Sequence, residues 1–183
     1  KAADQGHKNA QYSLGAMYRL GLGVEKSNST AAEWYRTAAD QGHKNAQYSL
    51  GYMYQEGRGV EKNDSTAAEW YRKAADQENA EAQYSLGYMY QEGRGVEKSD
   101  STAAVWYRKA ADQGNKNAQF DLGAMYRLGL GVEQSDSTAA EWYRKAADQG
   151  HKNAQYSLGA MYRLGLGVEK SNSTAAEWYR TAA

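Results

Sequence analysis

Three histidines are the residues of this chain whose type best suits catalysis or metal binding. His7, His43 and His151 stand at the same point of a repeated polar stretch. Histidines at equivalent points of successive repeats lie along a line, so they cannot converge on one metal ion or form a catalytic triad. We interpret them as solvated turn residues. Cysteine is absent, which excludes thiolate ligands and disulfides.

The glycines provide no recognisable nucleotide site. Gly21 and Gly23 flank a single residue, but a third glycine and a preceding strand are both missing. The Asp and Glu residues recur on the polar faces of the expected helices, which is typical of a solvated surface. We therefore predict no catalytic residue, no cofactor and no metal, and we expect that the chain is not an enzyme.

Aromatic side chains are the stronger candidates, because tyrosine is a frequent anchor of protein interfaces. Of the 16 tyrosines, those equivalent to Tyr18 and to Tyr35 recur in every repeat and are predicted to lie in the core. Two further tyrosines, Tyr52 and Tyr88, occur in two repeats only. A last set is predicted to form a ladder of stacked rings: Tyr12, Tyr48, Tyr84, Phe120 and Tyr156.

A strict period of 36 residues determines where these side chains lie. Tryptophan occurs only at Trp34, Trp70, Trp106, Trp142 and Trp178, and the methionines keep the same step. A period of this length predicts a solenoid, in which each unit buries its apolar face against its neighbours. Proline is absent, which suits a chain that is mostly helical.

One repeat contains two expected helices. Apolar residues at spacings of three and four predict a first helix over Ala10–Leu20, ended by the glycines that follow it. A second helix follows the polar run 27–30, in which any residue can be the N-cap, and Thr30 with Glu33 also fits a capping box. Gly15 lies inside the first helix at a cost of about 1 kcal/mol relative to alanine, so we expect that it permits a close approach between helices.

These elements predict an all-α fold, an α/α solenoid of five 36-residue helix-loop-helix repeats. We expect one array over residues 1–183, with units near 1–36, 37–72, 73–108, 109–144 and 145–180. Residues 1–39 are identical to 145–183, and neither end carries a polar capping repeat. We expect the chain to be a piece of a longer array, or its copies to stack end to end.

The repeat resembles the Sel-1-like repeat family, relatives of the tetratricopeptide repeat. The resemblance covers essentially the whole chain and rests in the second repeat on Ala46, Leu50, Gly51, Tyr54, Gly57, Gly59, Val60, Ala67, Trp70, Tyr71, Ala74 and Ala75. Two departures are Ser27 or Asn63 where the family usually has an acidic residue, and Glu78 in place of a glycine. The resemblance implies a right-handed superhelix of paired helices that serves as a protein-binding scaffold.

The repeats differ from each other at one coordinated set of positions. Repeats one, four and five have Ala, Arg, Leu and Leu at the positions of residues 16, 19, 20 and 22, whereas repeats two and three have Tyr, Gln, Glu and Arg. At about 100° per residue, positions 12, 16 and 19 point away from the packing face of the first helix. By analogy with tetratricopeptide-like folds, the face that contains positions 12, 16 and 19 lines the concave surface.

We therefore predict that this helix face is a partner-binding stripe with two chemically different parts. The cationic and more apolar part contains Ala16, Arg19, Leu20, Ala124, Arg127, Leu128, Ala160, Arg163 and Leu164, and the polar aromatic part contains Tyr52, Gln55, Glu56, Tyr88, Gln91 and Glu92. The ring set Tyr12, Tyr48, Tyr84, Phe120 and Tyr156 completes it. Duplication of two ancestral repeat types, without any role in binding, explains the same variation equally well.

The predicted function is a non-enzymatic scaffold or adaptor that binds a peptide or a partner domain; the alternative is a filament formed by head-to-tail stacking. Lys plus Arg and Asp plus Glu both number 22, so the charge signature of nucleic-acid binding is missing. No apolar run approaches the ~20 residues of a membrane span. We expect no nucleic-acid or membrane partner, and the sequence leaves the compartment open.

Overall fold

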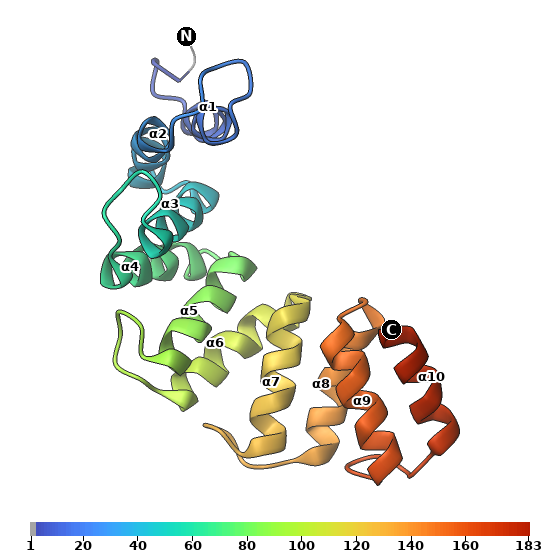
Figure 1. Ribbon diagram of the computed structural model, residues 1–183. Helices are drawn as coiled ribbons and strands as arrows, with labels where there is room; N and C mark the ends of the chain where they lie inside the picture. The colour runs from blue at the N-terminus through green and yellow to red at the C-terminus, as the bar shows by residue number, and fades with distance from the viewer. Residues whose placement is uncertain (1–2) are drawn as a thin grey trace. The chain divides into compact units, whose positions relative to one another are not determined.

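The computed structural model describes residues 3–183, and this part of the chain is built from ten helices (Figure 1). In the first half these are α1 (Lys8–Leu20), α2 (Asn28–Asp40), α3 (Lys44–Glu56), α4 (Asp64–Ala75) and α5 (Ala80–Glu92). In the second half these are α6 (Asp100–Asp112), α7 (Lys116–Leu128), α8 (Asp136–Asp148), α9 (Lys152–Leu164) and α10 (Asn172–Ala182).

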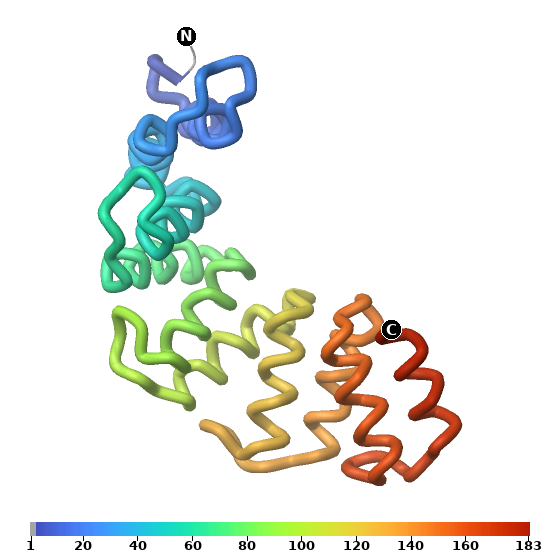
Figure 2. The backbone as a smooth tube through the Cα atoms, in the orientation of Figure 1, coloured from blue at the N-terminus to red at the C-terminus, as the bar shows by residue number. Residues whose placement is uncertain are grey.

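The chain divides into two compact units, residues 1–98 with α1 to α5 and residues 99–183 with α6 to α10. Within each unit, consecutive helices pack against each other as helical hairpins. Two kinds of connection alternate along the tube of Figure 2: a longer loop, as in residues 21–27, and a short turn, as in residues 41–43. The prediction of an all-α solenoid with five helix-loop-helix repeats is confirmed.

The polar run before each even-numbered helix supplies its N-cap from the first position. Ser27 Oγ accepts a hydrogen bond from the Thr30 N–H at 3.2 Å, and Asn63 Oδ1 accepts one from the Thr66 N–H at 2.9 Å. Thr30 itself lies inside α2, so the capping box of Thr30 and Glu33 is not formed. Serine and asparagine cap helices as well as aspartate does, which explains how these positions depart from the family pattern without loss of the cap.

Glycines end the odd-numbered helices, as predicted. Gly21 has φ +73° and donates its N–H to the Met17 carbonyl at 2.8 Å. The left-handed conformation disfavours residues with a Cβ. At the short turns the same conformation falls on Gly42, but in the third repeat it falls on Glu78, with φ +60°. The glycine replacement seen in the sequence therefore places a non-glycine residue in a strained backbone conformation.

The glycine inside the first helix of repeats one, two, four and five admits a tyrosine ring. A Cβ built on Gly15 would lie 2.8 Å from Tyr35 Cδ1 and 3.3 Å from the Ala31 carbonyl oxygen. The glycine therefore permits a close approach to α2, but the nearest neighbour is an aromatic side chain and the backbone of α2 is second. The same contact joins Gly51 to Tyr71 in the second repeat.

The core contains alanines of the even-numbered helices together with larger residues of both helix types. Leu50, Met53 and Tyr71 are buried, and so is Trp70. Trp34 and Trp178 are only half-buried. The Tyr35-type residues are core as predicted, apart from Tyr179, which is half-buried. The Tyr18-type prediction is wrong in degree, because every member of this set is half-buried: Tyr18, Tyr54, Tyr90, Tyr126 and Tyr162.

Polar contacts repeated at a fixed sequence separation join each repeat to the next. The buried Gln47 accepts a hydrogen bond from Gln77 at 2.7 Å and donates one to the Ala39 carbonyl at 3.1 Å. Arg36 donates to the Tyr54 hydroxyl and also lies over the Tyr54 ring. The same arginine contact is made by Tyr90, Tyr126 and Tyr162, so from the second repeat onward the hydroxyl of the Tyr18-type residue is held by an arginine of the preceding helix.

From the second repeat onward, the second glycine of each loop packs on the preceding repeat. A Cβ on Gly59 would lie 2.3 Å from the Asn28 carbonyl, and one on Gly95 would lie 2.3 Å from the Asp64 carbonyl. Gly23 has a similar φ of +70°, but the only neighbour of its added Cβ is Met17 Cε at 3.7 Å. These glycines therefore carry out two tasks, turn formation and contact between repeats, and Gly23 carries out only the first.

Candidate partner-binding site

The predicted stripe lies on the odd-numbered helices and is partly accessible throughout. At the ring positions the side chains are half-buried, except Tyr156, which is 63% exposed. Tyr88 is 37% exposed, whereas Tyr52 is half-buried. Leu20, Leu128 and Leu164 are exposed, as are Glu56 and Glu92. The stripe thus offers apolar, aromatic and charged groups to solvent within each compact unit.

Two members of the ring set make close contacts with other aromatic side chains. The Tyr12 ring lies 5.6 Å from Tyr35 in its own repeat and stacks at 4.7 Å on His43. Phe120 repeats this arrangement with Tyr143 and His151. The rings are therefore interleaved with side chains of the next turn, because the turn brings residue 43 over the ring of residue 12.

The interpretation of the histidines as solvated turn residues is wrong for two of the three. His43 Nδ1 accepts a hydrogen bond from the Ala46 N–H at 3.1 Å, and His151 caps α9 in the same way. His7 is exposed and makes no such bond. Asn79 and Asn115 cap α5 and α7 at the equivalent position, and this substitution by a strong N-cap residue was the signal available in the sequence.

Burial lowers the pKa of both capping histidines below the ordinary value of 6.5. The positive charges of Lys8, near His43, and of Lys116, near His151, act in the same direction. A neutral imidazole is also the form that can accept the cap hydrogen bond through Nδ1. The geometry and the pKa shift therefore favour the same protonation state.

The switch between repeat types preserves a hydrogen bond but reverses its direction. In the first repeat Arg19 Nε donates to the Tyr35 hydroxyl at 3.3 Å. In the second repeat the Tyr71 hydroxyl donates to Gln55 Oε1 at 2.7 Å. Burial raises the pKa of both tyrosines, so each hydroxyl stays protonated and can serve either role.

Two further positions of the switch are coupled by direct contact. The Arg58 guanidinium lies 5.1 Å from the centre of the Tyr52 ring, so the tyrosine and the arginine of this repeat type occur as a pair. Arg94, its counterpart in the third repeat, forms an ion pair of 3.0 Å with Asp64 of the preceding repeat. Contacts within the chain thus account for part of the coordinated variation. They do not account for the Leu20-type and Glu56-type positions, whose side chains are exposed.

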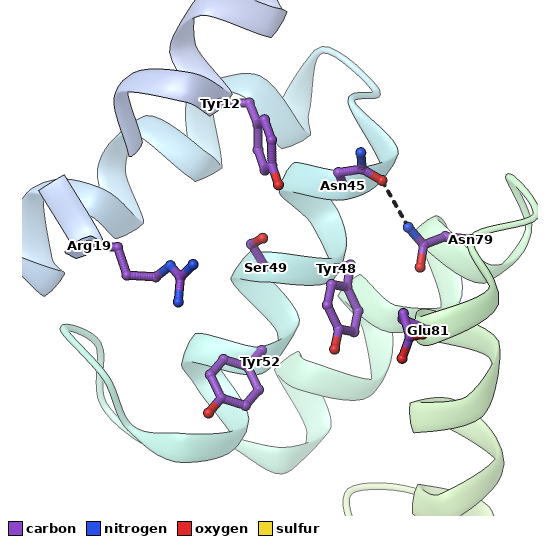
Figure 3. Close-up of a pocket in the computed structure, with 8 residues that line it drawn as sticks. All are labelled: Tyr12, Arg19, Asn45, Tyr48, Ser49, Tyr52, Asn79 and Glu81. Atoms are coloured by element: carbon purple, nitrogen blue, oxygen red, sulfur yellow. Dashed lines mark hydrogen bonds between the residues drawn. The ribbon is translucent and has the colours of Figure 1, made fainter. Parts of the chain in front are cut away.

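A pocket of about 370 Å³ opens where three odd-numbered helices of the first unit follow each other (Figure 3). Four of its lining residues belong to the predicted stripe: Tyr12, Arg19, Tyr48 and Tyr52. Sequence reasoning missed the other four: Asn45, Ser49, Asn79 and Glu81. Asn79 and Glu81 are the residues in which the third repeat departs from His43 and Asn45 of the second, and a comparison of the repeats could have identified them.

The described part of the chain contains no group of three or more His, Cys, Asp or Glu side chains placed to hold a metal ion. Within residues 3–183, none of the helices has the length and apolar character needed to cross a bilayer.

An array of paired helices with a partly exposed aromatic stripe defines a helical-repeat protein of the α-solenoid class. The Sel1 repeat matches five times, at residues 8–43, 44–79, 80–115, 116–151 and 152–183. The chain belongs to the Sel1 repeat family. Proteins with this repeat generally mediate protein–protein interactions, and the repeat is a non-catalytic scaffold fold.

Solved structures support the same assignment. The chain is 41% identical to c5321, a protective antigen of uropathogenic Escherichia coli with an SLR fold, at a TM-score of 0.97 over 99% of this chain and 39% of that one. It is 39% identical to a Sel1 repeat protein from Oxalobacter formigenes, at a TM-score of 0.93 over 97% of this chain and 73% of that one. No curated protein matches the sequence.

Proposed function

We propose that the chain is a non-enzymatic interaction scaffold that binds an extended peptide or a partner domain on the stripe of its odd-numbered helices. The observation that carries this proposal is the tyrosine-lined pocket on α1, α3 and α5, with Tyr52 among its lining residues. Its volume of about 370 Å³ lies within the range typical of ligand pockets. Tyrosines contribute large contact areas with few rotatable bonds, which makes them effective anchors for a partner.

The proposal is tested with a phage-displayed library of random ten-residue peptides selected on the purified chain. We expect peptides to be enriched, and we expect the double variant Tyr52→Ala plus Tyr88→Ala to lose them. Alanine is native at these positions in repeats one, four and five, so the helices themselves tolerate it. Circular dichroism and the melting temperature check that the variant remains folded.

Val105→Glu is the matched control, because Val105 is an exposed apolar residue of α6 outside the stripe. Glutamate is native at this position in the other four repeats. Enriched peptides should bind this variant as well as the parent. The opposite result is peptides that bind the tyrosine double variant but not Val105→Glu. It would show that the binding site lies on the even-numbered helices, and it would overturn the proposal.

Head-to-tail assembly, the alternative function, predicts a different behaviour of the chain alone. Light scattering coupled to size exclusion, over a hundredfold range of concentration, would then give a mass that rises with concentration. A constant mass near 20.2 kDa supports a scaffold that acts through its partners.

A further inference from the structure

The pocket on α1, α3 and α5 is lined by residues of both repeat types. Arg19 comes from a repeat of the first type, whereas Tyr52 comes from a repeat of the second type. Where a repeat of the first type is followed by another of the same type, as with Arg127, the position of Tyr52 is taken by Ala160. The combination of an arginine with a tyrosine from the following repeat is therefore specific to this junction within the described repeats of the first unit.

The arginine at one side of the pocket has binding capacity left. Arg19 is half-buried, and its Nε donates a hydrogen bond to the Tyr35 hydroxyl. Its two terminal nitrogens make no hydrogen bond with another described residue. Figure 3 shows the guanidinium extending from α1 toward Ser49 and Tyr52 of α3. Such a fork of N–H donors is suited to a carboxylate.

The opposite side of the pocket is negative. Glu81 lies on α5 beside Tyr48, where burial and, second to it, the negative charge of Glu81 raise the pKa of the Tyr48 hydroxyl. The first repeat and the second repeat have asparagine at this position, as have the fourth and fifth, so the carboxylate is unique to the third repeat. The two sides of the pocket therefore carry opposite charges on different helices.

Neutral polar and aromatic groups lie between the two charges. Asn79 Nδ2 donates to Asn45 Oδ1 at 3.0 Å, which orients the Asn45 side chain. The Asn45 amide nitrogen makes no bond with another described residue and can donate to a peptide carbonyl. The rings of Tyr48 and Tyr52 provide apolar surface beside it.

We propose that this junction pocket binds an extended segment of a partner protein that carries an acidic side chain against Arg19 and a basic side chain against Glu81. This inference rests on the proposed function and specifies the chemistry of the partner. Arg19 lies one residue before the end of α1, whereas Glu81 is the second residue of α5, so the two charges are separated both across the helices and along them. An extended chain advances ~3.3 Å per residue, so the acidic and basic residues should be several positions apart in the peptide.

The experiment repeats the selection from the random ten-residue library with three variants. Peptides enriched on the parent chain should share an acidic and a basic residue at this spacing. Arg19→Gln should remove the preference for the acidic residue and weaken the best peptides about tenfold, the size expected for loss of a charge-assisted hydrogen bond. Glu81→Gln should remove the preference for the basic residue. Glutamine is native at the position of Arg19 in repeats two and three, and it can accept from Tyr35 as Gln55 does from Tyr71.

Arg127→Gln is the matched control, because it makes the same change in a repeat with no second-type repeat after it. It should leave both preferences intact. Enriched peptides that depend on Tyr52 and Tyr88 but show no charge preference would overturn the charge-polarised pocket and leave the scaffold function standing. Failure to enrich any peptide would overturn both, and equal losses in Arg19→Gln and Arg127→Gln would replace the pocket with a general cationic stripe.

Discussion

At the scale of single residues, the capping histidines show how one position serves structure in two ways. The N-cap of each odd-numbered helix is either asparagine or histidine, and both Asn79 and His43 accept a hydrogen bond from the equivalent backbone N–H. Only histidine also stacks on the ring of the preceding repeat, as His43 does on Tyr12. Only histidine titrates near neutral pH.

The histidine caps make stability depend on pH. The folded-state pKa of His43 and of His151 lies below the unfolded value, so the unfolded chain binds more protons as the solution is acidified. Their stabilisation is complete above about pH 7, and it is lost as the pH falls below the ordinary histidine pKa and through the lowered folded value. Urea unfolding at a series of pH values from 7.5 to about 5 measures this loss.

The double variant His43→Asn plus His151→Asn is the control for this prediction. Asparagine keeps the cap, as Asn79 and Asn115 do, but has no titratable group. The part of the pH dependence of the unfolding free energy that comes from His43 and His151 should be absent in this variant. Because His7 is present in both proteins, it does not contribute to the difference between them. An unchanged slope would show that these two side chains do not couple to folding.

Residue types predicted the core better than they predicted the role of partly buried positions. The 36-residue period identified Tyr35 and its equivalents as core, because a buried side chain has the same apolar environment in each repeat. The same period could not show that Tyr54 is held by Arg36, or that His43 stacks on Tyr12. These contacts join different repeats, and their geometry depends on how the repeats pack and not on spacing within one helix.

At the scale of elements, the loop glycines separate backbone conformation from contact between repeats. Gly95 and Gly23 have nearly the same φ, +67° and +70°, and occupy the same loop position. Only the added Cβ of Gly95 meets backbone atoms of another repeat, at 2.3 Å from Asp64. The chain therefore contains its own matched pair for measuring the two effects.

Gly95→Ala should destabilise the chain more than Gly23→Ala does. Both variants incur the strain of a left-handed alanine, about 1–2 kcal/mol. Gly95→Ala must also push the loop away from α4, which should add about 1–3 kcal/mol, the range for overpacking. Chemical unfolding of the two variants in parallel provides the comparison. Equal losses would mean that the loop moves aside without cost and that contact between repeats here is not tight.

The helices and loops were largely predictable from the sequence, whereas the pocket was not. The helix-ending glycines and the first helix were expected, with the helix starting at Lys8 and not at Ala10. The stripe positions Arg19 and Tyr52 were identified from a difference between repeats, and Tyr12 was identified from the helix face that it shares with them. Asn45 and Ser49 line the same pocket because α1, α3 and α5 come together there, which the pattern of one repeat does not contain.

At the scale of the whole molecule, stability arises from contacts between neighbouring repeats. Trp106 is 7% exposed and Lys109 Nζ lies 4.1 Å from the centre of its ring. Trp106→Ala should cost about 3–5 kcal/mol of unfolding free energy, as expected for truncation of a core aromatic residue. Trp34→Ala should cost less, because Trp34 is half-buried. Equilibrium urea unfolding measures both, and a neutral Trp106→Ala would contradict the assignment of this residue to the core.

The repeated contacts between neighbours also affect how such a sequence can change in length. The glutamine pair recurs at a fixed offset, Gln41 with Gln11 and Gln77 with Gln47, so one repeat presents the same interlocking groups as the next. Unequal recombination that inserts or removes a whole 36-residue unit leaves these pairs intact, and copy number can drift with little effect on folding. The junction pocket does not share this tolerance. Loss of the second repeat, residues 37–72, would place Arg19 next to the third repeat and remove Asn45 and Tyr48. Partner recognition therefore depends on the order of the repeats, whereas stability does not.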